Sequence, residues 1–199
     1  MKKITSRDEV IISILVAVAV VFRIFAIPIT ESNTVIIHNI PLMILGFTYG
    51  PLFGLLGGVI MDLSSLPYQA GWNPFYMTAP IIWGVVPGLL KYIINHRKLW
   101  GLAIIEIVTH ILASASNKVV TWILYGGKAA LGPINVDKMN IIYPWLEKFI
   151  RFFSIDGVIY VGVLITILLM VIKIPFDVIL VSVLNDRVVD PLILQKEKV

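Results

Sequence analysis

Long apolar segments, separated by Pro, Gly or charged residues, make up most of this chain of 199 residues. Most of them approach the roughly 20 residues that a helix needs to cross the hydrocarbon core of a bilayer. Gly50-Pro51 divides one segment, because proline disfavours helical backbone in the residue before it and itself starts a helix well. The pattern predicts an all-α integral membrane protein, one domain over residues 1–199, with six transmembrane helices at about 8–26, 36–49, 51–65, 75–95, 99–125 and 157–184.

Basic residues gather at alternate ends of these segments, as they do on the cytoplasmic side of membrane proteins. Arg7 precedes the first helix, a basic cluster within 91–98 follows the fourth, and Arg187 follows the sixth. The predicted outer loops 29–35 and 67–74 contain no Lys or Arg. Both termini are therefore expected in the cytoplasm, and we expect a multi-pass protein of the cell membrane. The long outer loop between helices five and six has four basic residues, but long loops follow the charge rule weakly.

Composition supports the membrane assignment and narrows the chemistry. The chain is 58% hydrophobic, with a mean hydropathy of +0.93, which is far more apolar than a soluble globular protein. The net charge of +4 does not indicate nucleic-acid binding, because the basic residues mark helix ends rather than one patch. There is no cysteine, no phosphate-binding loop and no metalloprotease or serine-hydrolase motif. We therefore expect neither an enzyme nor a bound cofactor or metal.

The third predicted helix carries three glycines and one carboxylate. Gly54, Gly57 and Gly58 stand on adjoining turns and would let a neighbouring backbone come close, since packing drives helix association in lipid. Asp62, near the end of this helix, is costly unless a partner, a cavity or a ligand accepts it. Arg23 stands near the outer end of the first helix. Each charge is either a substrate-pocket residue or a helix-end group that reaches interfacial water.

A polar stripe follows the fifth predicted helix, where Glu106, His110, Ser114 and Lys118 recur every four residues and Thr109, Asn117 and Thr121 broaden the stripe. Such a stripe should face a cavity or the interior of the bundle. For Glu106 and His110, on the cytoplasmic half, we favour an internal ion-pair and hydrogen-bond ladder that holds the bundle together. For Asn117 and Lys118, on the outer half, we favour a role in ligand binding.

Two outer connections contain aromatic residues. Loop 67–74 includes Trp72 and Asn73, which could line a ligand entrance. Alternatively, the aromatic residues lie there because Tyr and Trp favour the membrane interface, whether or not a ligand binds. The connection 126–156 contains a segment, 141–153, that is typical of a short interfacial helix. That helix would either cap an outward-facing pocket or lie passively at the interface.

Two pairs of residues four apart predict contacts. Lys173 and Asp177 in the sixth helix are expected to pair with each other. Ser13 and Ala17 in the first helix form a small-xxx-small pair, which permits close helix contact. By spacing alone, that contact lies more readily inside the bundle than with a partner membrane protein.

A denser pattern lies in residues 40–63, which contain Ile40-Pro41-Leu42-Met43, Gly46-Phe47, Gly50-Pro51, Gly54, Gly57-Gly58 and Asp62-Leu63. This series resembles the helix-two to helix-three signature of the substrate-binding S components of energy-coupling factor (ECF) transporters, and is most similar to the folate-type branch. Sparser matches in the other helices are Arg23 with Ile27-Pro28, residues 84–88, residues 117–127 and Lys173-Ile174-Pro175.

The resemblance implies a six-helix vitamin-binding subunit that works with a membrane T component and two ATPase subunits. It also implies that Ser13 and Ala17 contact the T component, because family members use an Ala-x-x-x-Ala pattern there. Two regions depart from the folate type. Residues 73–77 lack the glycine and the hydroxyl of its Phe-Pro-Gly-Phe-Thr turn, and 133–160 resembles an insertion.

The sequence therefore predicts a high-affinity vitamin-binding S component, with folate as the first candidate and riboflavin, pantothenate or a queuosine precursor as alternatives. The predicted substrate site comprises Arg23, Asp62, Trp72, Asn73, Tyr76, Asn117 and Lys118. Arg23 and Lys118 would receive carboxylates, Asp62 or Asn117 would meet polar ring edges, and the aromatic residues would stack on a flat ring. A small secondary transporter, with Glu106 and His110 as its proton relay, is the rival interpretation; a membrane enzyme is a weaker one.

Overall fold

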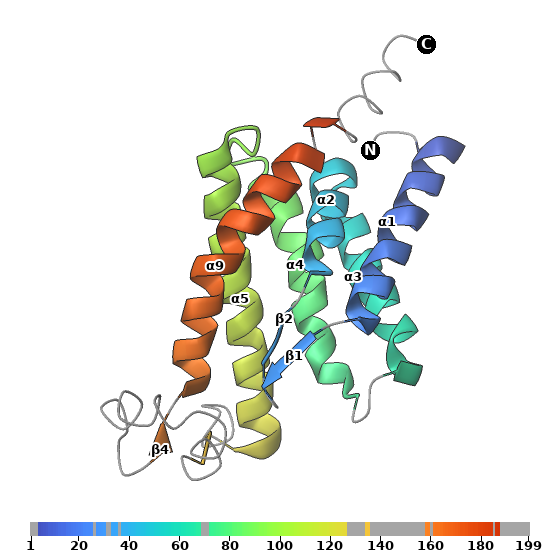
Figure 1. Ribbon diagram of the computed structural model, residues 1–199. Coiled ribbons are helices and arrows are strands. Elements are labelled where there is room, and N and C mark those ends of the chain that lie inside the picture. The colour runs from blue at the N-terminus through green and yellow to red at the C-terminus, as the bar shows by residue number, and fades with distance from the viewer. Residues whose placement is uncertain are drawn as a thin grey trace.

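Helices dominate the fold, in agreement with the predicted class (Figure 1). The computed structural model describes residues 4–25, 27–30, 33–35, 37–68, 72–126, 134–135, 158–159, 161–184 and 186–187. Its helices of two turns or more are α1 Ser6–Ile24, α2 Asn39–Tyr49, α3 Pro51–Ser64, α4 Thr78–Leu90, α5 Leu99–Tyr125 and α9 Val161–Leu184. The predicted interfacial helix at 141–153 lies outside the described residues.

Short elements that the helical pattern did not predict join some of these helices. Strands β1 (Ile27–Thr30) and β2 (Asn33–Val35) pair antiparallel after α1, and β3 (Ile134–Asn135) pairs with β4 (Val158–Ile159). Two 3₁₀ helices, η1 (Leu66–Tyr68) and η2 (Pro74–Met77), connect α3 to α4. The first pair is rich in Ile, Thr and Val, whose branched side chains favour extended backbone.

These short elements explain where some helices begin. Helix α2 starts at Asn39 rather than at 36, because residues 33–35 pair as β2. Helix α4 starts at Thr78 rather than at 75, because η2 comes first. Helix α9 starts at Val161, four residues after the expected position. Each difference shortens a predicted helix at its N-terminal end.

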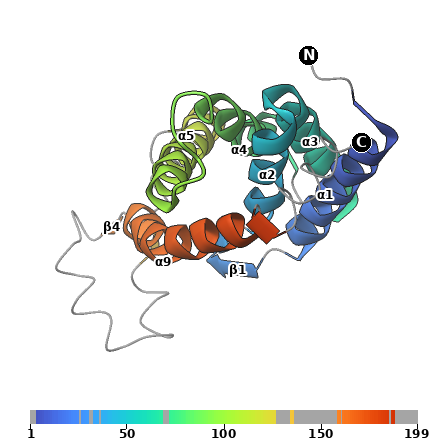
Figure 2. The ribbon, with the colours of Figure 1, turned by 90° about the horizontal axis from the view of Figure 1, so that it is seen from above.

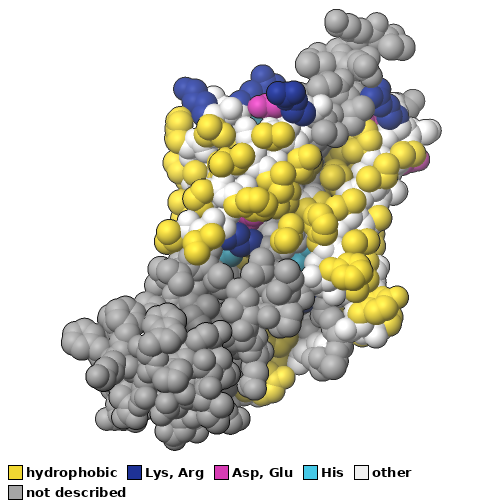
Figure 3. All heavy atoms as spheres, in the orientation of Figure 1, with side chains coloured by type: hydrophobic (Ala, Val, Ile, Leu, Met, Phe, Trp, Pro, Cys, Tyr) yellow, Lys and Arg dark blue, Asp and Glu magenta, His cyan; other side chains and the backbone are white. Residues whose placement is uncertain are grey.

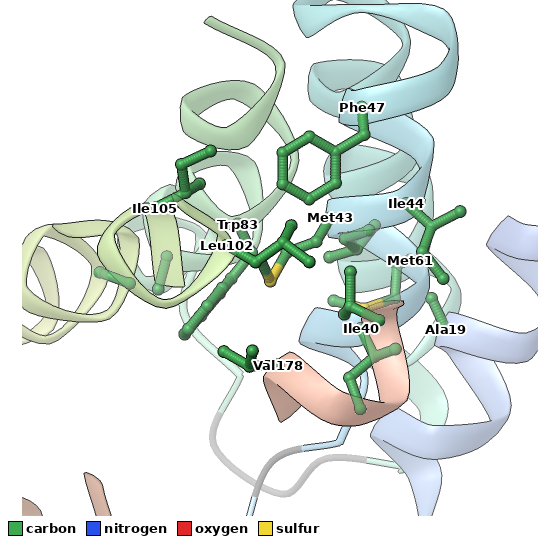
Figure 4. Packing of buried hydrophobic residues seen from close by; sticks show 14 residues of the cluster. Ala19, Ile40, Met43, Ile44, Phe47, Met61, Trp83, Leu102, Ile105 and Val178 are labelled. Atoms are coloured by element: carbon green, nitrogen blue, oxygen red, sulfur yellow. The ribbon is translucent and has the colours of Figure 1, made fainter. Parts of the chain in front are cut away.

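Helix α2 forms the centre of the bundle. Every residue from Asn39 to Phe47 is buried, as expected for a helix that is apolar on all sides. The view from above shows α2 enclosed by α1, α3, α4 and α9 (Figure 2). Figure 4 shows Met43 of α2 close to Trp83 of α4 and Leu102 of α5 within the apolar core.

Glycines bring α3 and α4 into direct backbone contact, as the glycine pattern of α3 predicts. A Cβ atom added at Gly54 would collide with the carbonyl oxygen of Gly84, and one added at Gly84 would collide with Gly54. Gly58 packs against the backbone of Pro80 in the same way. In lipid, such close packing replaces the exclusion of water as the force that holds helices together.

The surface is apolar along the bundle and basic at one end. Figure 3 shows hydrophobic side chains over the helices, and Lys and Arg gathered at the end near the chain termini. Lys91, just after α4, donates a hydrogen bond from Nζ to the carbonyl oxygen of Phe47 at 2.6 Å. Leu99–Tyr125 is long and apolar enough to span a bilayer by itself; Asn39–Tyr49, Pro51–Ser64 and Pro74–Leu90 are shorter apolar helices.

Candidate functional site

An ion pair links the ends of α1 and α3. Arg23 lies in the last turn of α1 and Asp62 near the end of α3, and Nη2 of Arg23 is 3.6 Å from Oδ1 of Asp62. The Asp62 side chain is 1% exposed and that of Arg23 is 20% exposed. Asp62 therefore does not reach interfacial water, because it points into the protein and meets a cation there.

Trp72 completes this group by donating a hydrogen bond from Nε1 to Oδ2 of Asp62 at 2.8 Å. One carboxylate oxygen thus faces the guanidinium and the other the indole. We call Arg23, Asp62 and Trp72 the outer cluster. Its aromatic member comes from the loop before α4, so the cluster ties that loop to α1 and α3.

Asn73 and Tyr76 lie on either side of the start of η2 and have structural partners. The Oδ1 atom of Asn73 accepts a hydrogen bond from the backbone N–H of Phe75 at 3.0 Å, which caps η2. The hydroxyl groups of Tyr76 and Thr121 are hydrogen-bonded at 2.8 Å. Tyr76 therefore connects η2 to the outer half of α5, where the predicted residues Asn117 and Lys118 stand.

Asn117 has an open acceptor. Its Oδ1 atom is buried and has no hydrogen-bond partner among the described residues. Lys118 is half-buried, and no described ion pair joins it to Asp62 or to any other carboxylate. The structure thus joins Arg23, Asp62 and Trp72 directly and relates Tyr76 to the α5 stripe, whereas no described contact links Lys118 to the outer cluster.

Deeper in the bundle lies a second polar group, which we call the inner cluster and define as Asn39, Glu106, Lys173 and Asp177. The Nδ2 atom of Asn39 donates to Oδ2 of Asp177 at 2.7 Å and to Oε1 of Glu106 at 3.4 Å. Lys173 pairs with Asp177 at 3.0 Å, which confirms the predicted contact. Asn39, Glu106 and Asp177 are each at most 1% exposed.

The polar stripe of α5 faces the bundle, as predicted. Glu106 and Thr109 are buried, whereas Ile107 and Ile111 of the same helix are exposed. His110 packs its ring edge-to-face against Trp83, with 5.2 Å between ring centroids. Glu106 therefore belongs to a polar network that joins helices of the bundle, in agreement with the favoured ladder, whereas the described contact of His110 is with an aromatic ring.

Sequence reasoning did not single out Asn39. A lone amide at the start of an apolar helix was the available signal, because an amide in such a position needs a partner from another helix. Its two partners lie 67 and 138 residues away along the chain. No spacing rule connects positions so far apart.

The small residues of α1 face outward. Ser13 and Ala17 are exposed, on a side of the helix that also exposes Val10, Ile14 and Val21. The Ser13 hydroxyl donates to the carbonyl oxygen of Glu9 at 2.8 Å, so its hydrogen bond stays within α1. This face is thus not packed against the described part of the bundle.

Within the described residues, no group of three or more His, Cys, Asp or Glu side chains is arranged to hold a metal ion.

An apolar helical bundle with buried charged groups reaching one end is the architecture of a membrane protein that handles a polar solute. The family model described as "ECF transporter, substrate-specific component" matches residues 7–184, and the chain belongs to this family. The family is one of membrane transporter components rather than of enzymes.

A solved structure supports the fold. The chain is similar to FolT, in a crystal structure bound with folic acid, with a TM-score of 0.62 and 20% sequence identity over 93% of this chain and 96% of that one. At this identity the likeness shows the shared fold. The comparison with curated proteins finds no match.

Proposed function

We propose that this protein is the folate-binding S component of an ECF importer. The observation that carries the proposal is the outer cluster, in which a buried carboxylate holds a partly exposed arginine and an indole at one end of the bundle. Arginine recognises carboxylates through its planar fork, and folate ends in a dicarboxylic amino acid. The fold shared with a protein that was crystallised with folic acid supports the same ligand class.

Each predicted site residue has a role in this proposal. Arg23 and Lys118 attract the two carboxylates, and Asp62 keeps Arg23 in position. The open Oδ1 acceptor of Asn117 receives a donor from the ligand, because a buried acceptor without a partner is costly. Trp72 and Tyr76 offer flat faces to the aromatic part, with Asn73 holding η2 in place.

Transport follows from the partners that the family name implies. In our proposal the exposed face of α1 with Ser13 and Ala17 docks on the T component, and two ATPase subunits supply the energy. The protein crosses the cell membrane with six helices and has both termini in the cytoplasm. The basic end of the bundle, which lies near both termini, supports this orientation (Figure 3).

Ligand binding to the purified protein in detergent tests the proposal. Titration calorimetry should give tight binding of folic acid and no comparable binding of riboflavin, pantothenate or a queuosine precursor. Arg23→Gln should weaken folic-acid binding at least tenfold, whereas Arg97→Gln, which removes an exposed arginine at the opposite end, should leave it unchanged. Equal effects of the two substitutions would reject the outer cluster as the site.

A further inference from the structure

The connection between α4 and α5, residues 91–100, gathers three basic side chains at the end of the bundle near the chain termini (Figure 1). They are Lys91, Arg97 and Lys98, of which the last two are exposed. Residues 63–105 contain no Asp or Glu. Among the described residues, neither Arg97 nor Lys98 has an acidic partner. The connection therefore carries a local excess of positive charge that no described residue neutralises.

Contacts with Phe47, near the end of α2, fix the shape of this connection. The Nζ atom of Lys91 donates to the carbonyl oxygen of Phe47 at 2.6 Å. The His96 ring stacks on the Phe47 ring, with 5.5 Å between ring centroids. The Oδ1 atom of Asn95 accepts a hydrogen bond from the backbone N–H of Arg97 at 3.1 Å. The beginning and the end of the connection are thus both anchored on Phe47, so that its cations belong to one surface.

Exposed tryptophans indicate the depth at which this surface lies in a membrane. Helix α5 is long and apolar enough to span a bilayer by itself. Trp100 in its first turn and Trp122, 22 residues later, are both exposed. Such a stretch of helix is about 33 Å long, close to the thickness of the hydrocarbon core, and Trp favours the two interfaces of the bilayer. The connection before Trp100 therefore lies at the level of the lipid headgroups.

Large apolar side chains are exposed beside the cations. Ile93 is 82% exposed, more than any other large apolar side chain that the structure describes, and Tyr92 and Leu99 are exposed as well. The Nζ atom of Lys91 lies 5.2 Å from the centre of the Tyr92 ring. Cations beside apolar side chains at headgroup depth match a phospholipid, in which a phosphate group is joined to acyl chains.

We propose that residues 91–100 form a binding surface for anionic phospholipids of the adjacent leaflet. The lipid phosphate pairs with Arg97 and Lys98, Trp100 lies at the interface, and Ile93 reaches into the acyl-chain region. Each cation near an anionic bilayer surface contributes roughly fivefold to the affinity. The surface lies at the opposite end of the bundle from the outer cluster, so the inference does not depend on which vitamin the protein binds.

Native mass spectrometry of the full-length protein in detergent tests the proposal, by titration with phosphatidylglycerol and with phosphatidylcholine of the same acyl chains. The wild-type protein should bind the first phosphatidylglycerol molecule roughly tenfold more tightly or better, and the double variant Arg97→Gln/Lys98→Gln should lower this preference by roughly fivefold or more. Arg187→Gln is the matched control, because it removes an exposed arginine just after α9, and should leave the preference unchanged.

Three outcomes would overturn the proposal. The first is equal affinity of the wild-type protein for the two lipids, which decides the matter even where the double variant fails to fold. The second is an equal effect of Arg187→Gln and the double variant. The third is displacement of phosphatidylglycerol by an equal concentration of glycerol phosphate, which has no acyl chains and would assign the surface to a soluble phosphate ester.

Discussion

The outer and inner clusters are both buried and charged, but they are balanced differently. In the outer cluster, the single carboxylate of Asp62 is matched by one guanidinium and one indole N–H. In the inner cluster, Glu106 and Asp177 share one ammonium and one amide. Both clusters contain a buried carboxylate oxygen that has no hydrogen-bond partner among the described residues, but the outer cluster has one carboxyl group for its one cation, whereas the inner cluster has two.

This difference determines how a substitution in each cluster changes the stability of the ligand-free protein. Removing one partner of a buried ion pair strongly destabilises the folded protein, because the remaining charge is then buried without a counter-charge. Where two carboxyl groups share one cation, removing one of the negative charges relieves the ligand-free protein. Removing the charge of Arg23 and removing that of Glu106 should therefore change stability in opposite directions.

The largest change in the free energy of unfolding is expected when Arg23 is substituted. Arg23→Gln leaves Asp62 buried without its cation and should lower the free energy of unfolding of the ligand-free protein by roughly 3 kcal/mol. Thermal unfolding in detergent measures it, with the exposed Arg97→Gln as control. Adding Asp62→Asn to Arg23→Gln should recover much of the loss, and a double variant no more stable than the single one would contradict the pairing.

A smaller loss is expected when the bridge of the inner cluster is removed. Asn39→Leu keeps the approximate size of the side chain but deprives Glu106 and Asp177 of their shared donor, which should cost about 2 kcal/mol of unfolding free energy. The same thermal unfolding assay applies. Asn95→Leu, at an exposed position outside the helices, is the control; a similar change in both variants would mean that the bridge contributes little.

Trp72→Phe should have a weaker effect, because it keeps a ring and removes only the N–H that Asp62 accepts. We expect a loss of about 1.5 kcal/mol in unfolding free energy, typical of a hydrogen bond to a charged group. Trp100→Phe, at an exposed indole near the start of α5, should be close to neutral. If Trp72→Phe unfolds at the wild-type temperature, the indole does not support the carboxylate.

The smallest change in stability, and the one of opposite sign, is expected at Glu106. Glu106→Gln removes one of the two carboxyl groups that share Lys173 and Asn39 and supplies a donor, so the ligand-free protein should be as stable as the wild type or more stable by about 1 kcal/mol. Thermal unfolding of the ligand-free protein measures the change. A clear loss of ligand-free stability would mean that the two clusters do not differ in the way described.

Much of the architecture follows from local patterns in the sequence. The apolar segments predicted the helices, and Gly50-Pro51 predicted the boundary between α2 and α3. The glycines of α3 predicted a close helix contact, which the structure shows with α4. The four-residue spacing of Lys173 and Asp177 gave their ion pair. These features depend on neighbours in the chain or on one face of one helix, so periodicity is sufficient to predict them.

The sequence by itself thus determined a bundle of apolar helices, the side of α5 that turns inward and the family to which the chain belongs. Only the tertiary structure decided that Asp62 meets Arg23 and Trp72, and that Asn39 joins Glu106 to Asp177. The physical reason is that buried charges in a membrane protein take their partners from whichever helices pack around them. That choice is made by the packing of α1, α2, α3, α5 and α9, and not by spacing along the chain.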